Sequence, residues 1–573
     1  MTKNFLSLFN DSNSIKDETT GEIIITAPKI ANNGSCEINT SCKIKSNCNT
    51  VITGDILEIT TPSVSISGIS FEMSVRAKNI NGFTMNDCTI TKAKTGEGSL
   101  VINNCENVTL SHITITDSVK LPGLYVNGQS VVSADNITVH DLTETLVVCN
   151  TGSYLTVTDS TLHHTQANGV FSSGQSYIEI RNTSFSDTKY PAVYVTESQM
   201  VLINDSFQNT DQNALGVYKS TDFVVEKCTF KKICGTAIQI CDQSTGVINE
   251  NRISDIEGNG VYSTGNSKIE CKNNKVTDIS YPAFALTNQT VGSLFGNEIR
   301  NIKFSGICVR GAKHVKIEGT HISLTRESGI SISDTEECEV VGNRIEKCDI
   351  ASIEGYNQSR VTICDNDISD IGKYGFLAYT SGYMKAENNR IEEVGKAIVK
   401  LAYKGGGEFI NNRVANCANQ CQCETSSPYF FSGNGNLPGV TNIPEKVSDT
   451  VRLDEPYVDH NSLCLKCNKK PRDYYLIECG HKVYCKDCAE LALKNHENCP
   501  LCRFPIVNVS SGFGASNEDT CIICCEKKSD CIILPCGHMG CCSSCLENWF
   551  KNKQCCPICR SEPSFFKKII NDI

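Results

Sequence analysis

The chain has 573 residues, of which 20% are charged, and its formal net charge is -11. Nucleic-acid binding needs a basic face that neutralises phosphates, so this balance argues against nucleic acid as the main partner. A chain of this length is also too long for one compact core, and we expect several folded units.

The 35 cysteines raise the question of the compartment. Residues 1–21 contain only a brief apolar patch and do not resemble a secretory signal, and no run of apolar residues is long enough to span a membrane. We therefore predict a cytoplasmic protein, with the nucleus as the alternative. Its thiols would stay reduced and act as metal ligands or small core residues.

Residues 1–19 carry no periodic pattern, and we expect a disordered N-terminus there. From residue 20 to residue 417 the sequence repeats itself about every 23 residues. The period is clearest in one apolar column, whose members are Ile90, Ile115, Val139, Leu162, Phe185, Phe207, Phe230, Ile253, Val276, Ile299, Ile322, Ile345, Ile368, Ile391 and Val414.

An asparagine column stands two positions before the apolar column: Asn251, Asn274, Asn297, Asn343, Asn366, Asn389 and Asn412, with Thr320 as the exception. Asn tolerates the left-handed conformation of a tight corner, and stacked amides can hydrogen-bond along a pile. A second apolar stretch follows in each repeat with the period of two that is typical of strands. We expect two or three short strands per repeat.

A repeat of short strands and turns forms a solenoid, because each coil buries a stripe on its neighbours that it could not bury alone. The pattern resembles the right-handed, single-stranded parallel β-helix of pectin-lyase-like proteins. The predicted fold class is therefore mostly β, with a β-helix over residues 20–417. The alternative is a leucine-rich repeat, which also has an Asn at its turn, although the columns here contain little Leu.

Enzymes with the β-helix fold use clustered carboxylates, and this chain shows only an isolated Asn209-Thr210-Asp211 triplet. A partly acidic column follows the apolar one, at Asp117, Asp141, Asp187, Asp255, Asp278, Asp370 and Glu393, and we interpret it as a solvated edge in preference to a calcium site. The scattered histidines form no ligand spacing; they are His112, His140, His163, His164, His314 and His321. Four cysteines in strand positions are expected in the core: Cys228, Cys308, Cys348 and Cys364. We predict no catalytic residue.

Residues 418–463 lack the period and are interpreted as a linker or cap. A cysteine-rich cassette then begins at Cys464 and recurs whole 57 residues later, with every Cys and His landing on its own kind. Zinc is held tetrahedrally by such thiolates and imidazoles, and about 40 residues need a metal to fold. Eight ligands in each copy predict two zinc ions per copy and four in the chain. A disulfide framework is disfavoured by the single His at one fixed place.

Both cassettes resemble RING fingers, whose ligand pairs interleave. The resemblance implies four ligand sets: Cys464, Cys467, Cys485 and Cys488; Cys479, His481, Cys499 and Cys502; Cys521, Cys524, Cys542 and Cys545; and Cys536, His538, Cys556 and Cys559. Four further thiols have no cysteine at the equivalent position of the first copy and are interpreted as non-ligands: Cys525, Cys531, Cys541 and Cys555. The fingers are assigned to residues 464–503 and 521–573, with a linker at 504–520.

The same resemblance implies contacts with a ubiquitin-conjugating enzyme at Leu465, Pro500 and Arg503 in the first finger and at Ile522, Trp549, Pro557 and Arg560 in the second. Trp549 is the only Trp, and we expect the second finger to be the main recruiter. The tail with Phe565, Phe566, Ile569 and Ile570 resembles the apolar end through which some RING fingers dimerise. A homodimer through this tail stays an open alternative.

These features predict a RING-type E3 ubiquitin transferase that acts by positioning, without a covalent intermediate. Its β-helix would bind a protein target, and its fingers would bind the conjugating enzyme and ubiquitin. Neither a nucleic acid nor a membrane is an expected partner. The alternatives are a non-catalytic scaffold of zinc fingers and β-helix, and a carbohydrate-active β-helix enzyme.

Overall fold

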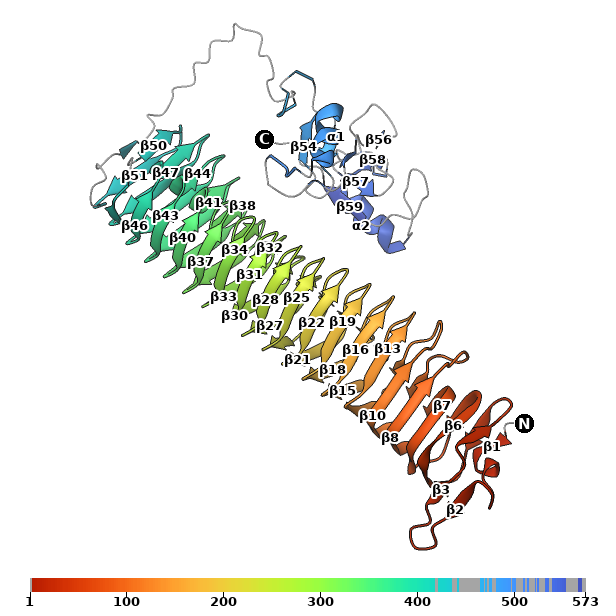
Figure 1. Cartoon of the computed structure of the whole chain (residues 1–573). Helices are drawn as coiled ribbons and strands as arrows, with labels where there is room; N and C mark the ends of the chain where they lie inside the picture. The colour runs from red at the N-terminus through yellow and green to blue at the C-terminus, as the bar shows by residue number, and fades with distance from the viewer. Residues whose placement is uncertain are drawn as a thin grey trace. The chain divides into compact units, whose positions relative to one another are not determined.

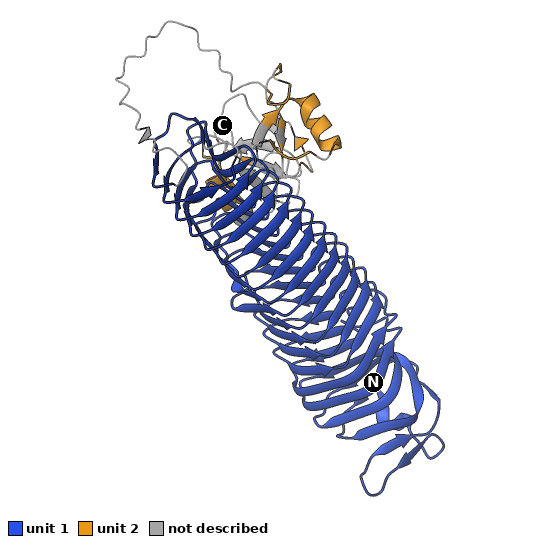
Figure 2. Ribbon diagram, turned by 60° about the vertical axis from the view of Figure 1, so that its left-hand side comes forward, with its two compact units in different colours: residues 1–447 blue, residues 448–573 orange. Residues whose placement is uncertain are grey.

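The computed structural model describes residues 3–417, 421–434 and 441–442, and in the C-terminal part it describes residues 464–467, 469–470, 474–476, 481–495, 497–500, 506, 509–510, 513–514, 521, 523–524, 531–534, 538–552 and 565–568. The chain divides into two compact units, Met1–Val447 and Ser448–Ile573 (Figure 2). Within the described ranges there are two α-helices, α1 (Lys486–Lys494) and α2 (Ser543–Asn552), and both lie in the second unit. No helix in the described residues is long and apolar enough to cross a membrane.

The first unit is a parallel β-helix with three short strands in each coil (Figure 1). A typical coil contains β16 (Thr161–Thr165), β17 (Val170–Ser172) and β18 (Tyr177–Arg181). Each strand pairs in parallel with its equivalent in the next coil, which are β19 (Ser184–Thr188), β20 (Val193–Thr196) and β21 (Gln199–Ile203). The pattern continues to β50 (Cys421–Glu424) and β51 (Tyr429–Ser432) and confirms the predicted fold class.

The only helix among the described residues of this unit is a 3-10 turn, η1 (Phe5–Leu8). A leucine-rich repeat with a helical segment in each coil is therefore excluded. Near the N-terminus the strands are longer and run through the corners, as in β6 (Lys43–Ile59), β7 (Val64–Lys78), β8 (Asn81–Thr91) and β10 (Glu106–Thr116).

The predicted apolar column lies in one row inside the β-helix. Its members are Cα partners from coil to coil, from Ile90 and Ile115 to Ile391 and Val414. The rings of Phe185 and Phe207 stack with their centroids 4.7 Å apart, and Phe207 and Phe230 stack at the same distance. Each buried Ile, Val or Phe contributes about 1.5–3 kcal/mol, so the column is a continuous core.

The asparagine column forms a buried hydrogen-bonded ladder. The Nδ2 of Asn251 donates to Oδ1 of Asn274 at 2.9 Å and to the carbonyl of Val225 at 2.9 Å. Oδ1 of Asn274 also accepts the backbone N–H of Asn251 at 3.0 Å. The same set recurs from Asn343 through Asn366, Asn389, Asn412 and Asn434. Every amide atom thus has a partner, as a buried polar group requires.

The expected backbone role of this column was wrong. Left-handed φ values occur at the residues just before the ladder, such as Asn273, Asp365 and Asn388, and not at the ladder asparagines themselves. The partly acidic column is a second left-handed row, with φ near +55° at Asp141, Asp187, Asp255 and their equivalents. Asp and Asn are enriched in this conformation because their short polar side chains bond locally. The acidic column therefore has a backbone cause.

Residues 3–19 form ordered elements, which corrects the disorder expected over residues 1–19. The strand β1 (Lys3–Asn4) pairs in parallel with β5 (Cys36–Ile38), and β2 (Ser14–Lys16) pairs with β3 (Ile23–Ile25). Phe5 is fully buried in the main core. A cap has no repeat of its own, so a search for periodicity does not find it. The apolar patch around Phe5 was the one feature of the sequence that indicated a buried segment here.

The β-helix also extends beyond the predicted end at residue 417. The strands β50 and β51 pair in parallel with β47 (Ala397–Ala402) and β48 (Gly406–Ile410), and Phe431 packs into the core. Asn434 continues the ladder, because its Oδ1 accepts from Nδ2 of Asn412 at 2.8 Å. This boundary was missed because the last step is 22 residues and the apolar column stops at Val414.

Asp205 occupies a ladder position but lacks the amide donor. Its Oδ1 accepts the N–H of Thr183 at 2.8 Å, while its buried Oδ2 has no hydrogen-bond partner. Burial raises the pKa of the Asp205 carboxyl to about 7, against the opposing effect of its backbone hydrogen bonds. The folded state therefore holds a proton here that the unfolded chain releases near its ordinary pKa of 3.8.

We predict that Asp205→Asn stabilises the β-helix, because Asn supplies the missing Nδ2 donor. Wild-type stability should fall as pH rises from about 4 to about 7. The gain from the substitution should grow over the same range and reach about 1–3 kcal/mol. Denaturant unfolding of the wild type and the variant at pH 5 and pH 8 measures the pH dependence of wild-type stability and the gain from the substitution. The reciprocal variant Asn274→Asp should be destabilised, and equal stability of Asp205→Asn and wild type at pH 8 would contradict the argument.

Candidate zinc centres and the β-helix groove

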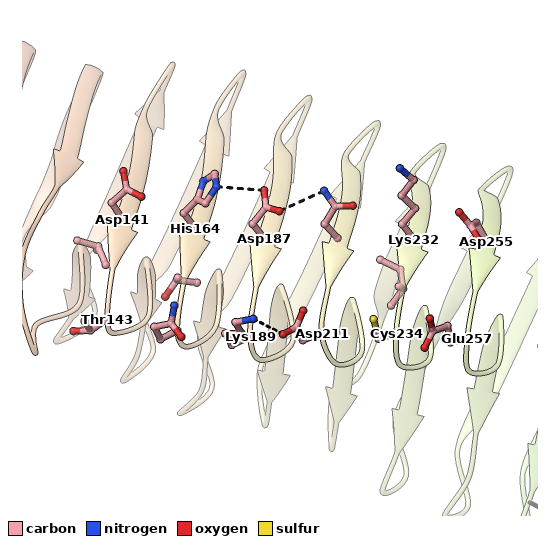
Figure 3. Close-up of a pocket in the computed structure, with 15 residues that line it drawn as sticks. Asp141, Thr143, His164, Asp187, Lys189, Asp211, Lys232, Cys234, Asp255 and Glu257 are labelled. Carbon is pink, nitrogen blue, oxygen red and sulfur yellow. Dashed lines mark hydrogen bonds and ion pairs between the residues drawn. The ribbon is translucent and has the colours of Figure 1, made fainter. Parts of the chain in front are cut away.

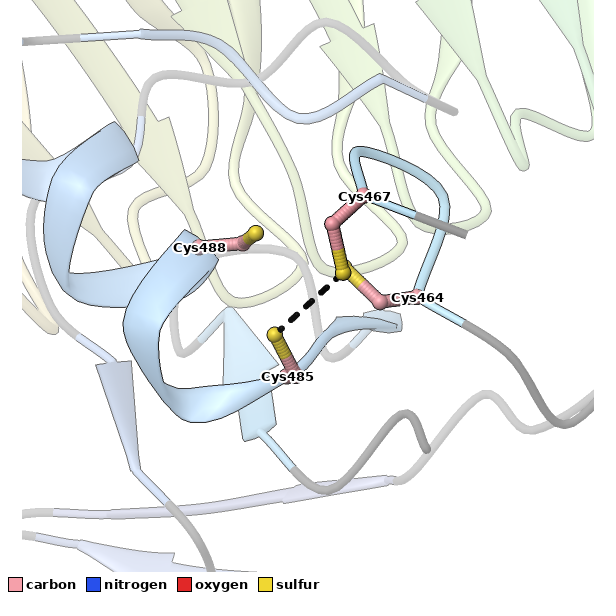
Figure 4. Close-up of side chains that lie close together, drawn as sticks. All are labelled: Cys464, Cys467, Cys485 and Cys488. Carbon is pink, nitrogen blue, oxygen red and sulfur yellow. Dashed lines mark hydrogen bonds between the residues drawn. The ribbon is translucent and has the colours of Figure 1, made fainter. Parts of the chain in front are cut away.

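The second unit contains two clusters of four cysteines. The first consists of Cys464, Cys467, Cys485 and Cys488 (Figure 4). The second consists of Cys521, Cys524, Cys542 and Cys545. Within each cluster the four sulfur atoms lie within 4.8 Å of one another. These are the first and third ligand pairs of each predicted finger, so the structure brings together the sets that the interleaved pattern implies.

Each cluster is built by a turn and a helix start. Cys464 and Cys467 lie in one turn, and Cys485 is the residue at which α1 begins. The strand β54 (His481–Tyr484) leads directly into Cys485 and pairs with β53 (Tyr474–Leu476). In the second finger β57 (Cys531–Leu534) and β58 (His538–Cys541) lead into Cys542 and α2 in the same way. The turn therefore positions the first pair of thiols in each site, and the hairpin and the start of the helix position the second pair.

The thiol chemistry of these clusters fits zinc. Backbone N–H groups of Lys469 and Lys470 lower the pKa of the Cys467 thiol to about 6, which favours a thiolate. Desolvation and the neighbouring sulfurs of Cys485, Cys464 and Cys467 raise the pKa of Cys488 to about 12. Four thiolates so close together repel one another unless a cation lies between them. Zinc prefers four such thiolates in a tetrahedral arrangement.

The second ligand set of each finger lies largely outside the described residues. Cys499 is described and buried, and only the backbone of His481 and His538 is described. Cys479, Cys502, Cys536, Cys556 and Cys559 lie outside the described residues, as do the surplus thiols Cys525 and Cys555. These ligands stay predictions from the sequence.

The duplicated unit is longer than the cysteine pattern suggested. The strand β55 (Val509–Ser510) pairs with β53, with Leu476 opposite Val509. In the second finger β59 (Phe565–Lys568) pairs with β57, with Ile533 opposite Phe566. Each of these four residues has its equivalent 57 positions away. Both fingers therefore end with the same closing strand, and part of the expected linker at 504–520 belongs to the first finger.

A second part of that linker belongs to the second finger. The strand β56 (Phe513–Gly514) pairs with β58, with Phe513 opposite His538. Ile506 is also buried in the core of the first finger. These short strands were not predicted, because each contains a single apolar residue, Val509 or Phe513, among Asn, Ser and Gly.

The expected contact residues are only partly described. Leu465 is 41% exposed, while Pro500 and Trp549 are half-buried. Ile522, Pro557, Arg560 and Arg503 lie outside the described residues. The position of Trp549 in α2 is taken by Ala492 in α1, and Ala492 is fully buried. An exposed apolar residue of α1 that was not predicted is Leu491, at 47% exposure.

The β-helix carries a groove of about 780 Å³ along six coils (Figure 3). One wall is the left-handed row with Asp141, His164, Asp187 and Lys232, and the other includes Lys189, Asp211, Cys234 and Glu257. Lys189 Nζ lies 2.6 Å from Asp211 Oδ2, and His164 Nε2 lies 3.8 Å from Asp187 Oδ2. The groove is lined by five carboxylates and two lysines, so its net charge is negative.

This groove was not predicted from the sequence. Its two walls lie two positions apart in each coil, and only one of them had been recognised as a repeating column. Three histidines also gather beside it: His140 stacks on His163 at 4.9 Å, and His163 contacts His164. Among the described residues, only the two cysteine clusters have the spacing of a metal site. Cys228 and Cys348 are buried as expected, but Cys308 and Cys364 are only half-buried.

Comparison with known proteins agrees with this architecture. The family described as "Right handed beta helix region" matches residues 145–293 and 282–435. The family described as "Zinc finger, C3HC4 type (RING finger)" matches residues 460–509 and 517–565.

The chain is 36% identical over 56 residues to "Mitochondrial E3 ubiquitin protein ligase 1" of Drosophila melanogaster, which is 10% of this chain and 16% of that protein. It is 48% identical over 114 residues to "E3 ubiquitin-protein ligase rnf8-B" of Xenopus laevis, which is 19% of this chain and 20% of that protein. The chain thus spans a fifth or less of the length of these relatives.

Among solved structures, the "Mannuronan C-5 epimerase AlgE4 A-module" of Azotobacter vinelandii aligns over 64% of this chain and 91% of its own, with 10% identity and a TM-score of 0.28. A similarity of that size carries no argument about function. The two family matches cover residues 145–435 of the β-helix and both fingers. The chain belongs to the right-handed β-helix family and carries two C3HC4 RING fingers at its C-terminal end.

Proposed function

We propose that this protein is a RING-type E3 ubiquitin ligase. The observation that carries the proposal is the pair of four-thiol clusters in a duplicated RING pattern, together with the similarity of this region to named E3 ubiquitin ligases. Each finger would hold two zinc ions, one in the described cluster and one in the set that includes His481 or His538. Bound zinc supplies folding free energy and takes no part in bond chemistry.

The transfer itself would occur on the conjugating enzyme. The ε-amine of a target lysine attacks the thioester carbonyl of the loaded ubiquitin, an isopeptide bond forms, and the thiol of the conjugating enzyme leaves. The finger accelerates this step by holding the two proteins in a reactive geometry, which is catalysis by positioning. Exposed Leu465 and half-buried Trp549 offer apolar contact area on the two fingers.

The β-helix would bind the target protein. Its groove presents five carboxylates and two lysines over six coils, so it favours a partner with a basic segment. A scaffold that only assembles other proteins is the second candidate, because solenoids commonly present binding surfaces. A cytoplasmic location would suit the two four-thiol clusters, because a reducing compartment keeps cysteines available as metal ligands.

Zinc content tests the metal assignment. Purified wild-type chain should contain four zinc ions, and Cys467→Ser or Cys524→Ser should each lower the content to about two, because a finger that loses one site unfolds. Elemental analysis measures this. The exposed thiol variant Cys234→Ser in the β-helix is the control and should keep all four ions. Full zinc in Cys467→Ser would show that this cluster is not a zinc site.

Autoubiquitination with a panel of conjugating enzymes tests the activity. We expect Trp549→Ala, and Arg560→Ala from the sequence pattern, to lower the rate at least tenfold while the zinc content is kept. Leu465→Ala should have a smaller effect, because we assign recruitment mainly to the second finger. The exposed control Leu491→Ala should resemble wild type. If zinc-loaded wild type gives no product with any enzyme, the scaffold function replaces this proposal.

The role of the groove is tested on target proteins in cells. Asp187→Asn combined with Asp211→Asn should leave autoubiquitination unchanged and reduce ubiquitin-remnant peptides on cellular targets at least threefold. Asp367→Asn combined with Glu337→Gln removes two exposed acids elsewhere on the β-helix and is the control. An equal loss in both double variants would show that the groove has no special role.

A further inference from the structure

Two cysteines that lie outside the predicted zinc sets face each other across the hairpin of the second finger. Cys531 in β57 is the register partner of Cys541 in β58, at a bulge in the antiparallel ladder. Both side chains are fully buried, and they share one small core with Cys521, Cys542 and Leu546. The two thiols therefore lie on the same side of the hairpin.

The first finger has no thiol at either place. The equivalents 57 positions earlier are Tyr474 and Tyr484, which are register partners in β53 and β54. Tyr484 is buried, at 4% exposure. An aromatic pair in one finger is thus replaced by a cysteine pair in the other, at the same two positions of the same hairpin.

The hairpin geometry suits a disulfide. Directly opposed residues of antiparallel strands have Cα atoms about 4.5–5.5 Å apart. A disulfide needs Cα atoms about 4.4–6.8 Å apart and side chains that leave the backbone toward one another. Because the two residues are register partners and both are buried in one core, their side chains leave the hairpin on the same face.

We propose that Cys531 and Cys541 are a redox-sensitive dithiol that hydrogen peroxide oxidises to a cross-strand disulfide in the zinc-loaded second finger. One sulfur attacks a peroxide oxygen, the O–O bond breaks, and one water leaves with a sulfenic acid formed. The other sulfur attacks this sulfenic sulfur, the disulfide forms, and a second water leaves. The two sulfurs lose two electrons, and the peroxide gains them.

The disulfide would close a loop that contains two predicted zinc ligands, Cys536 and His538. Cross-linking the two ends of a loop lowers the conformational entropy of the opened state. Zinc should therefore leave the oxidised second finger more slowly than the reduced one. The first finger offers no equivalent effect, because Tyr474 and Tyr484 cannot cross-link.

Met539 lies between the two cysteines and gives a direct test. The full zinc-loaded chain is treated with hydrogen peroxide, alkylated, and cleaved at Met with cyanogen bromide. We expect the fragments on the two sides of Met539 to stay joined until reduction, with Cys531 and Cys541 protected from alkylation and four zinc ions retained. Cys531→Val and Cys541→Val should each give separate fragments.

A second measurement follows zinc release from the second finger into a chelator. Release should slow at least threefold after peroxide in wild type. It should not change in Cys531→Tyr combined with Cys541→Tyr, which copies the pair of the first finger. Full alkylation of Cys531 and Cys541 after peroxide would overturn the proposal. So would a bridge mapped to a zinc ligand with loss of metal, or joined fragments in either Val variant.

Discussion

Coil-on-coil hydrogen bonding in a fixed register is the constraint on which the first unit depends. From coil to coil the strands of the repeat pair in parallel, so their residues lie on their equivalents. Like therefore meets like: Phe207 stacks between Phe185 and Phe230, and Asn366 bonds to Asn343 and Asn389. A side chain can stay in the core only if its neighbours on both sides accept its shape and its hydrogen bonds.

Most of the β-helix could be predicted from the sequence, because a pattern that recurs in every coil is more informative than any single segment. The apolar column and the amide ladder are confirmed residue by residue, since a side chain that meets its own kind must recur at the same spacing. The left-handed corners were assigned to the wrong column, because Asn serves both purposes and periodicity does not distinguish them. The N-terminal cap around Phe5 was missed, since a cap does not repeat.

The fingers were predictable for a different reason. Zinc requires particular residue types at particular spacings, so the ligands of each cassette could be recognised in the sequence, and the resemblance to RING fingers implied that Cys464, Cys467, Cys485 and Cys488 share one ion. The closing strands β55 and β59 could not, because a two-residue or four-residue strand is determined by its partner and not by its own composition. Their equivalence across 57 residues becomes clear only when the pairing is known.

The shared 23-residue register also affects how such a chain can change over generations. The apolar column, the ladder and the left-handed rows all repeat with the same period. An in-frame gain or loss of one whole coil therefore leaves each remaining neighbour facing its own kind, and it lengthens or shortens the groove by one coil. The β-helix can thus be resized by recombination without any change to the zinc fingers.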